Sequence, residues 1–358
     1  MIVSATGTHT ACCSGEGPPA REPGRNQPQG RNPAMPRKPA TVIVVGGGIV
    51  GTAVAHTLQG PCQVILVDDG EFPGLAETRT ALGVIRAVYG REPLDTYARA
   101  TWEFALAQHE NPRSPLRLRL AALDGRTARA AFLDHLLLLD AFLLLARRAG
   151  CQLRVGWQVT GLLLAGGRVR GVRAAPAGDG GTGEVIPADA VILAPGPRPD
   201  TLALEGLPPG FVRRFQRVQD IIIPFRLPAP SDGEPARAEA AVITARSLIW
   251  TFITGLEPRT LHAVARLAGD WMPPSFEQSV AMVEDLYHRF QLPGEAELDR
   301  IRTCIDLAGP GGAPFAGPVA PLGGAEGLFV AAGLGLEGLS LCKGVAGVVA
   351  REVLAYLQ

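Results

Sequence analysis

The hydrophobic pattern of the chain begins near residue 40. Residues 41–45 form an uninterrupted run of β-branched side chains, which is typical of a parallel strand buried on both faces. A helix is predicted over 49–59 and a second buried strand over 63–67. Residues 1–38 are rich in Gly, Pro, Asn and Arg and have no hydrophobic periodicity, so we expect them to form a disordered leader.

The rest of the chain alternates between helical and strand periodicity. Two strands over 152–174 are joined at Ala165-Gly166-Gly167, which indicates a hairpin. Period-two alternation over 248–252 and 261–267 is typical of half-buried antiparallel strands. Further buried strands are expected at 190–194 and 328–332, and helices at 93–109, 136–148, 275–292 and from about 343 to 357.

This order of elements predicts an α/β fold in two interleaved domains. The first is a Rossmann-like nucleotide-binding domain assembled from residues 39–90, 150–210 and 305–358. The second is a smaller α+β substrate domain built on an antiparallel sheet, from residues 91–149 and 211–304.

The composition narrows the classes of partner. Lys+Arg and Asp+Glu both number 34. The chain therefore has no net positive charge that would attract nucleic acid or an anionic membrane. The apolar stretches 132–146 and 328–349 contain charged residues, so we expect no membrane span. Six scattered cysteines have no zinc-type spacing, which predicts no metal site and a reduced, cytoplasmic protein.

The first strand leads into a dinucleotide-binding motif. The sequence TVIVVGGGIVG contains G-x-G-x-x-G, in which Gly46 permits the tight turn, Gly48 lets a pyrophosphate approach and Gly51 lets helix and strand pack closely. Asp68, with Asp69 as the lesser candidate, ends the second strand where an acid bonds the ribose hydroxyls and disfavours NADP. The motif by itself does not distinguish FAD from NAD.

Four further segments carry a resemblance to a family. Residues 327–340 (GLFVAAGLGLEGLS) have a strand, a Gly-rich loop and a helix; residues 310–318 read PGGAPFAGP; residues 188–196 read ADAVILAPG; residues 84–90 read VIRAVYG. The first three resemble, in that order, the second flavin-binding segment, the "PDGxPxIGP" turn and the returning strand of the FAD-dependent family of D-amino-acid oxidase, glycine oxidase and monomeric sarcosine oxidase. The last segment resembles the "RxIRxxYG" of the sarcosine oxidase branch, while Gly311 replaces the usual acid of the turn.

The resemblance implies bound FAD and removal of hydride from the carbon next to the nitrogen of an amino acid or secondary amine. The Gly-rich loop before the last helix could stabilise the reduced flavin, and Lys343 in that helix's first turn could add a charge. Besides the motif residues, the resemblance implies FAD-binding positions at Ile49, Val50, Val159, Ala194, Gly196, Cys304, Gly333, Gly335, Leu336, Glu337, Gly338, Leu339 and Ser340.

Two residues acquire specific roles from the resemblance. Arg86 lies where sarcosine oxidase-like enzymes place an arginine that binds the substrate carboxylate, although it could equally be a surface or interdomain arginine. This chain has Ser340 at the position where that branch has a supporting lysine. Whether the substrate carries an α-carboxylate is therefore left open. Cys304 falls where the branch carries the cysteine that bonds the flavin 8α-methyl group; an ordinary buried cysteine is the alternative.

The residues near the flavin leave the electron acceptor open. His262, on the polar side of its strand, either faces the flavin or, as we favour, is a solvated strand residue. Glu337 either faces the substrate or caps the last helix. The lysine that activates oxygen in sarcosine oxidase-like enzymes is missing, so Arg246, Arg259 or His262 substitutes for it, or another acceptor takes the electrons, as in a dehydrogenase.

Two functions from different classes therefore remain. The first is an FAD-dependent oxidase or dehydrogenase that acts on a small-molecule amine or amino acid. The second is an FAD-binding subunit that serves assembly or electron transfer in a hetero-oligomer. The missing lysine and the Leu336-Glu337 pair in the C-terminal loop keep the second hypothesis open.

Overall fold

The computed structural model describes most of the chain after residue 37. The described residues are 38–123, 126–178, 182–198, 200–226, 240–245, 248–254, 260–268, 276–290, 297–299 and 301–358. The expected leader, apart from Lys38, lies outside them, as do Arg246 and Arg259.

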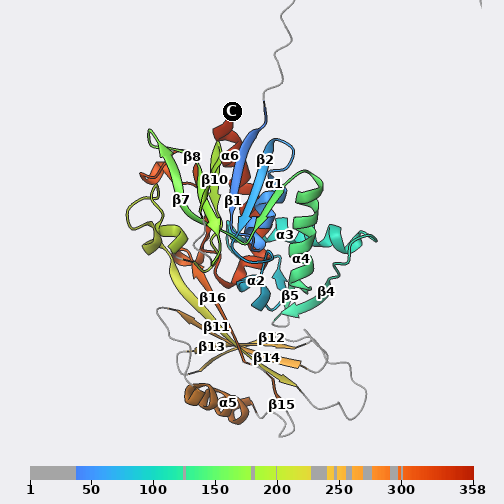
Figure 1. The fold of residues 1–358 in the computed structure, drawn as a ribbon. Coiled ribbons are helices and arrows are strands. Elements are labelled where there is room, and N and C mark those ends of the chain that lie inside the picture. Colours follow the sequence, from blue (N-terminus) through green and yellow to red (C-terminus); the bar gives the residue numbers. More distant parts are fainter. Residues whose placement is uncertain are drawn as a thin grey trace, which may run out of the picture. The chain divides into compact units, whose positions relative to one another are not determined.

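A six-stranded sheet forms the centre of the nucleotide-binding part (Figure 1). Its strand order is β17-β18-β10-β1-β2-β6, and β17 alone is antiparallel to its neighbour. The bounds are β1 Ala40–Val45, β2 Cys62–Asp68, β6 Gln152–Val155, β10 Ala190–Leu193, β17 Phe315–Pro318 and β18 Leu328–Ala332. The predicted buried strands are therefore confirmed as neighbours in one sheet.

Both faces of this sheet are covered. Val42 and Val44 belong to a core shared with the helices α1 (Ile49–Thr57), α3 (Leu94–Glu110), α4 (His135–Arg148) and α6 (Gly338–Leu357). Ile43 and Val45 belong to a second core, shared with the strands β7 (Trp157–Ala165), β8 (Arg168–Pro176) and β9 (Glu184–Pro187). Burial on both sides explains why the central strands β10 and β18 are apolar at every position rather than at every second one.

A separate antiparallel sheet makes up most of the second part (Figure 1). Its order is β12-β13-β14-β11-β15, and β11 also pairs with β16. The bounds are β11 Gln216–Arg226, β12 Ala240–Ala245, β13 Leu248–Thr254, β14 Thr260–Ala268, β15 Glu297–Leu298 and β16 Arg302–Ala308, with helix α5 at Phe276–Phe290. A Rossmann-like domain together with a second part built on an antiparallel sheet is the fold class that the sequence predicted.

Short elements complete the described residues. A three-stranded sheet of order β3-β5-β4 joins β3 Val84–Arg86, β4 Arg119–Leu123 and β5 Arg126–Phe132, and helix α2 covers Glu77–Thr80. The 3-10 turns are η1 Asp200–Ala203, η2 Phe211–Arg214, η3 Pro310–Gly312, η4 Ala320–Leu322 and η5 Gly335–Glu337.

Three features differ from the sequence expectations. The last helix begins at Gly338, five residues before Lys343, because its glycines are held by packing although they disfavour an isolated helix. The sheet of β3, β4 and β5 was not predicted. Helices α3 and α4 share the core of the six-stranded sheet, whereas the sequence grouped them with the substrate part.

In the described part of the chain no helix is long and apolar enough to cross a membrane.

Candidate functional site

A large cavity lies where the strand order of the six-stranded sheet reverses. From β1 the chain proceeds to β2 and β6 on one side and returns to β10 on the other side of β1. The carboxyl ends of β1 and β10 are therefore neighbours, and Ala194 N donates to Val45 O at 2.8 Å. Ligands of open α/β sheets bind at such a switch point. Here the cavity has a volume of about 460 Å³.

The glycine turn after β1 forms one wall of this cavity. Gly46 has a φ of 105°, and a Cβ on it would lie 2.2 Å from Ala194 O, so a larger residue is excluded by both conformation and space. A Cβ on Gly51 would lie 1.8 Å from Gly46 O. Gly51 therefore packs the helix against the turn and does not line the cavity, whereas Gly48, Ile49 and Val50 do.

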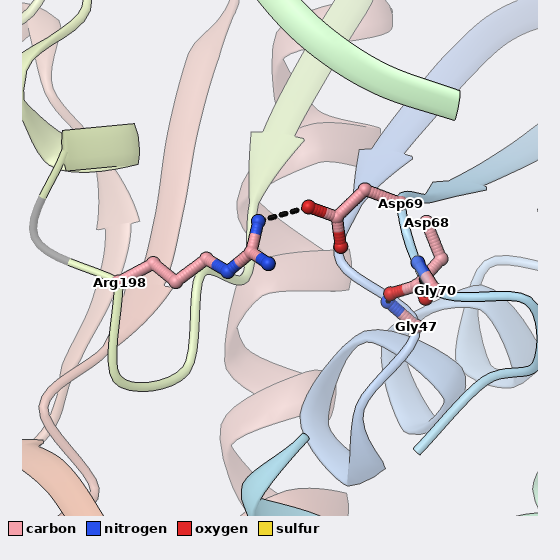
Figure 2. A network of polar contacts seen from close by, with 5 residues as sticks. All are labelled: Gly47, Asp68, Asp69, Gly70 and Arg198. Carbon is pink, nitrogen blue, oxygen red and sulfur yellow. Dashed lines mark hydrogen bonds and ion pairs between the residues drawn. The ribbon is translucent and has the colours of Figure 1, made fainter. Parts of the chain in front are cut away.

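Asp68, which ends β2, and Asp69, which follows it, have different partners (Figure 2). Asp68 accepts hydrogen bonds from Gly47 N at 2.5 Å and from Gly70 N at 2.9 Å, so its carboxylate fixes the glycine turn. Burial raises the pKa of Asp68, and these two amides oppose the rise. Asp69 pairs instead with Arg198, which follows β10. Both aspartates and Arg198 line the cavity.

The C-terminal Gly-rich segment forms the wall facing the glycine turn. Gly333, Gly335, Leu336, Gly338 and Leu339 line the cavity, at the junction of β18, η5 and the start of α6. Val159, Ala194 and Gly196 line it as well. Two helix N-termini, those of α1 and α6, thus contribute to one cavity, and such ends favour anionic groups. These residues fit a dinucleotide.

A third wall comes from the antiparallel sheet and from α2. Cys304 and Asp306 lie two residues apart on β16 and both line the cavity, together with Glu77. Glu77 Oε2 accepts hydrogen bonds from Ile305 N at 2.9 Å and from Thr80 Oγ1 at 3.2 Å, which links α2 to β16. Burial raises the pKa of the Cys304 thiol, and Glu77 adds to the rise.

Asp306 is the most perturbed carboxyl group of the cavity wall. Burial, followed by the neighbouring Glu77, raises its pKa to about 8, while its hydrogen bond from Leu307 N at 2.7 Å acts in the opposite direction. Asp306, Glu77 and Thr78 line the cavity but were not predicted from the sequence. The signal that could have found Asp306 is its period-two spacing from Cys304, which places both side chains on one face of a strand.

The raised pKa of Asp306 predicts a pH dependence of stability. The folded protein holds this proton between the usual carboxyl pKa of 3.8 and about 8, whereas the unfolded chain has lost it. Stability therefore decreases as the pH rises across that window. We expect the FAD-bound protein to lose at least about 1 kcal/mol more unfolding free energy between pH 6 and pH 9 than Asp306→Asn does. Urea denaturation measures this, with Glu71→Gln, an exposed carboxylate, as control. Parallel pH curves for the protein and Asp306→Asn would contradict it.

Several predicted residues lie outside the cavity wall. Arg86 N donates to Ser340 Oγ at 3.1 Å, and Glu337 Oε2 accepts from the Tyr89 hydroxyl at 2.6 Å. Glu337 stands at the N-cap of α6 but its side chain makes no cap hydrogen bond, so the expected capping role is wrong. Its other expected role, toward the substrate, stays a prediction. This network joins β3 to α6 behind the Gly-rich segment.

Lys343 does not face the cavity. Because α6 begins at Gly338, Lys343 lies beyond its first turn, and its Nζ donates to Thr57 Oγ1 at 2.8 Å at the end of α1. Lys343 also lies over the Phe104 ring at 6.0 Å. The expectation that it adds charge to the flavin site from the first turn of the helix is wrong.

The sequence favoured a solvated position for His262, and this prediction is wrong. Its side chain is 1% exposed. It lines a second cavity, of about 450 Å³, together with Arg119, Arg302 and Phe132. The sequence error arose because period two assigns a residue to a face of a strand but does not reveal what covers that face.

Comparisons with known proteins agree with this geometry. The family model described as DAO, FAD dependent oxidoreductase, matches residues 41–128 and 120–352. Similar solved structures include glycine oxidase from Bacillus cereus ATCC 14579, with a TM-score of 0.63 and 15% identity over 88% of this chain and 98% of that chain. Iminodiacetate oxidase from Chelativorans sp. BNC1 has a TM-score of 0.62 and 20% identity over 88% and 95%. L-proline dehydrogenase from P. horikoshii has a TM-score of 0.65 and 14% identity over 87% and 92%. No curated protein matches the sequence.

Proposed function

The chain belongs to the DAO family of FAD-dependent oxidoreductases, and we propose that it removes a hydride from the carbon next to the nitrogen of an amino acid or secondary amine. FAD is the cofactor of the family. Glycine oxidase, iminodiacetate oxidase and proline dehydrogenase, by their names, act on amino acids or an amine dicarboxylate and share the fold. The proposed substrate is accordingly a small amine or amino acid.

The single observation that carries this proposal is a titratable carboxyl group in the wall of the nucleotide cavity. When bound, FAD supplies the hydride acceptor. An amine must lose its extra proton before it can give up hydride from the adjacent carbon. Asp306, whose pKa burial raises to about 8, is a stronger base than an ordinary carboxylate, and its deprotonated form is suited to accept that proton at neutral to slightly alkaline pH.

The apolar surroundings of this carboxyl support the same role. Cys304 belongs to a buried cluster with Phe132, Ile222 and Val264, against which Leu336 packs. An environment of this kind excludes water and strengthens the attraction between a carboxylate and an ammonium group. The substrate would thus meet Asp306, with Glu77 near it, beside an apolar cluster.

Arg86 remains the candidate for a substrate carboxylate, although it lines neither of the two cavities described here. The proposed electron acceptor is one other than oxygen. Lys343 is bonded to Thr57, and of the three residues expected to replace the missing lysine only His262 lies among the described residues. His262 lies in the second cavity, beside the nucleotide cavity, with which it shares Ala81.

A turnover screen tests the proposed function. The FAD-bound protein is mixed anaerobically with sarcosine, proline, pipecolate or D-amino acids, and the flavin absorbance is followed, with a dye acceptor and oxygen supplied in parallel. Bleaching by any of these supports the proposal, and Asp306→Asn is expected to slow it at least about tenfold at pH 7. A protein that binds FAD but is bleached by none of them favours the alternative, an FAD-binding subunit of a hetero-oligomer.

FAD is expected to be bound without a covalent bond to Cys304. Thiolates rather than thiols are nucleophiles, and burial, reinforced by Glu77 and Asp306, raises the pKa of this thiol. After acid precipitation we expect the yellow colour in the supernatant, and an equal FAD content in Cys304→Ser. Colour that stays in the protein pellet would show a covalent bond instead.

A further inference from the structure

The cavity for FAD carries an ion pair at its rim. Asp69, directly after β2, pairs with Arg198, which follows β10 (Figure 2). Both residues line the cavity, yet 25% of the Asp69 side chain and 48% of the Arg198 side chain are exposed to solvent. Side chains that border a cavity and also meet solvent stand between the two. The ion pair therefore lies at the rim of the cavity and not in its interior.

The pair crosses the carboxyl end of β1. This strand lies between β10 and β2, and neighbouring strands are about 4.8 Å apart, so the ends of β10 and β2 are separated by roughly 10 Å. The two side chains together bridge this span, and Figure 2 shows Arg198 extended toward Asp69. The glycine turn leaves β1 at this point, and such a turn binds the pyrophosphate of a dinucleotide. A nucleotide on the turn would therefore lie beneath the ion pair.

The Asp69 end of the pair is held in place by its neighbours. Asp68 accepts hydrogen bonds from Gly47 N at 2.5 Å and from Gly70 N at 2.9 Å. Gly70 O in turn accepts from Gly156 N, between β6 and β7, at 2.8 Å. The residues on both sides of Asp69 are thus bonded to the glycine turn and to a second segment of the wall. The Asp69 carboxylate is therefore a fixed post at the rim.

The Arg198 end is the part that can move. Arg198 N donates to Pro195 O at 3.3 Å, which closes a short turn after β10, but the long side chain extends from this turn. Within the described part of the chain, Asp69 is the one group that accepts a hydrogen bond from the guanidinium. Ion pairs with this much exposure are weak and break readily. Loss of this single contact releases the side chain and opens the rim.

Direct binding of the FAD phosphates is the alternative role of Arg198. It is the one basic side chain among the described residues that line the cavity. The pyrophosphate, however, has its site at the glycine turn and the N-terminus of α1. The Arg198 charge is also already paired, and moving it to a phosphate would leave the half-buried Asp69 carboxylate without its partner beside an anionic cofactor. The contacts therefore favour a role at the rim.

We propose that the Asp69–Arg198 ion pair is a latch over the nucleotide, which must open each time FAD enters or leaves the cavity. A latch that makes no contact with the cofactor interacts equally with the free and the FAD-bound protein. It therefore slows entry and departure by the same factor and leaves the affinity unchanged. The latch requires bound FAD but no particular substrate, so it does not depend on the proposed reaction.

Exchange of bound FAD tests the latch. The FAD-bound protein is incubated with an excess of radiolabelled FAD, and the label that the protein retains after gel filtration gives the rate at which bound FAD leaves. Arg198→Gln and Asp69→Asn are each expected to raise this rate about two- to fivefold, the range for loss of an exposed ion pair. The double variant is expected to be no faster than either single variant. Added salt is expected to accelerate exchange in the native protein and not in the variants.

A second ion pair supplies the matched control. Arg154 and Glu184 have side chains that are 39% and 40% exposed, and neither residue lines the cavity. Glu184→Gln removes this pair and is expected to leave the exchange rate unchanged. The affinity for FAD, measured by fluorescence quenching on the flavin-depleted protein, is expected to be the same in the native protein, Arg198→Gln and Asp69→Asn.

Three results would overturn the proposal. The first is an exchange rate that neither Arg198→Gln nor Asp69→Asn changes. The second is a double variant in which the effects of the single variants add. The third is weaker FAD binding in Arg198→Gln with stronger binding in Asp69→Asn, because that pattern would show that Arg198 binds the anionic cofactor directly. If Arg198→Gln does not fold, Asp69→Asn decides by the same measurements.

Discussion

Gly344→Ala is expected to lower the free energy of unfolding by about 3 kcal/mol, whereas Gly347→Ala, three residues further along the same helix, is expected to raise it by up to about 1 kcal/mol. A Cβ on Gly344 would lie 2.1 Å from Tyr97 Cα and 2.6 Å from Tyr97 O. These are backbone atoms of α3, so no rotation of a side chain can relieve the clash. The two helices would have to move apart.

Gly347 is the matched control because its surroundings are open. No atom lies within 4 Å of a Cβ placed on it, and the residue is exposed in the middle of α6. The change to alanine therefore adds no contact and reduces only the backbone entropy of the unfolded chain. Urea denaturation of both variants measures the difference. Equal stabilities would show that α3 and α6 do not approach as closely as described.

Gly48→Ala is expected to fold normally and to bind FAD at least a hundredfold more weakly, which corresponds to about 2.7 kcal/mol. Gly48 has extended backbone angles, φ −69° and ψ −177°, that alanine also adopts. A Cβ there would meet one atom of the protein, Thr78 Oγ1 at 3.5 Å, which is an ordinary contact. The methyl group would instead occupy the side of the cavity that the FAD pyrophosphate approaches.

The measurement is FAD affinity by fluorescence quenching on the flavin-depleted protein, with the melting temperature measured in parallel. Gly347→Ala again is the control, because it lies outside the wall of the cavity. A Gly48→Ala variant with native FAD affinity would exclude close approach of the cofactor at this turn. Loss of both affinity and fold would contradict the contact distances around Gly48.

Local sequence was sufficient where a single segment makes its own structure. The turn from β1 to α1 could be predicted because Gly46, Gly48 and Gly51 follow a buried strand at fixed offsets. The start of α6 could not, because Gly338 and Gly344 disfavour a helix by propensity, and the packing of α6 on α1 and α3 overrides that preference.

The partners of the candidate site residues required the tertiary structure. Glu337 bonds to Tyr89, 248 residues away, and Ser340 bonds to the backbone of Arg86, 254 residues away. Asp306 has its raised pKa because burial and Glu77 meet at one place in the fold. These contacts could not be predicted from the sequence, because the partners follow no hydrophobic period and no fixed spacing along the chain.

The sequence by itself determined the buried parallel strands, the glycine turn and the family to which the chain belongs, because each depends on residues that are neighbours along the chain. The tertiary structure alone decided that Gly344 is confined and Gly347 is not, that His262 is buried, and that Asp69 meets Arg198 across the end of β1. The physical reason is that burial and close approach are set by distances between segments, and such distances depend on how the elements pack.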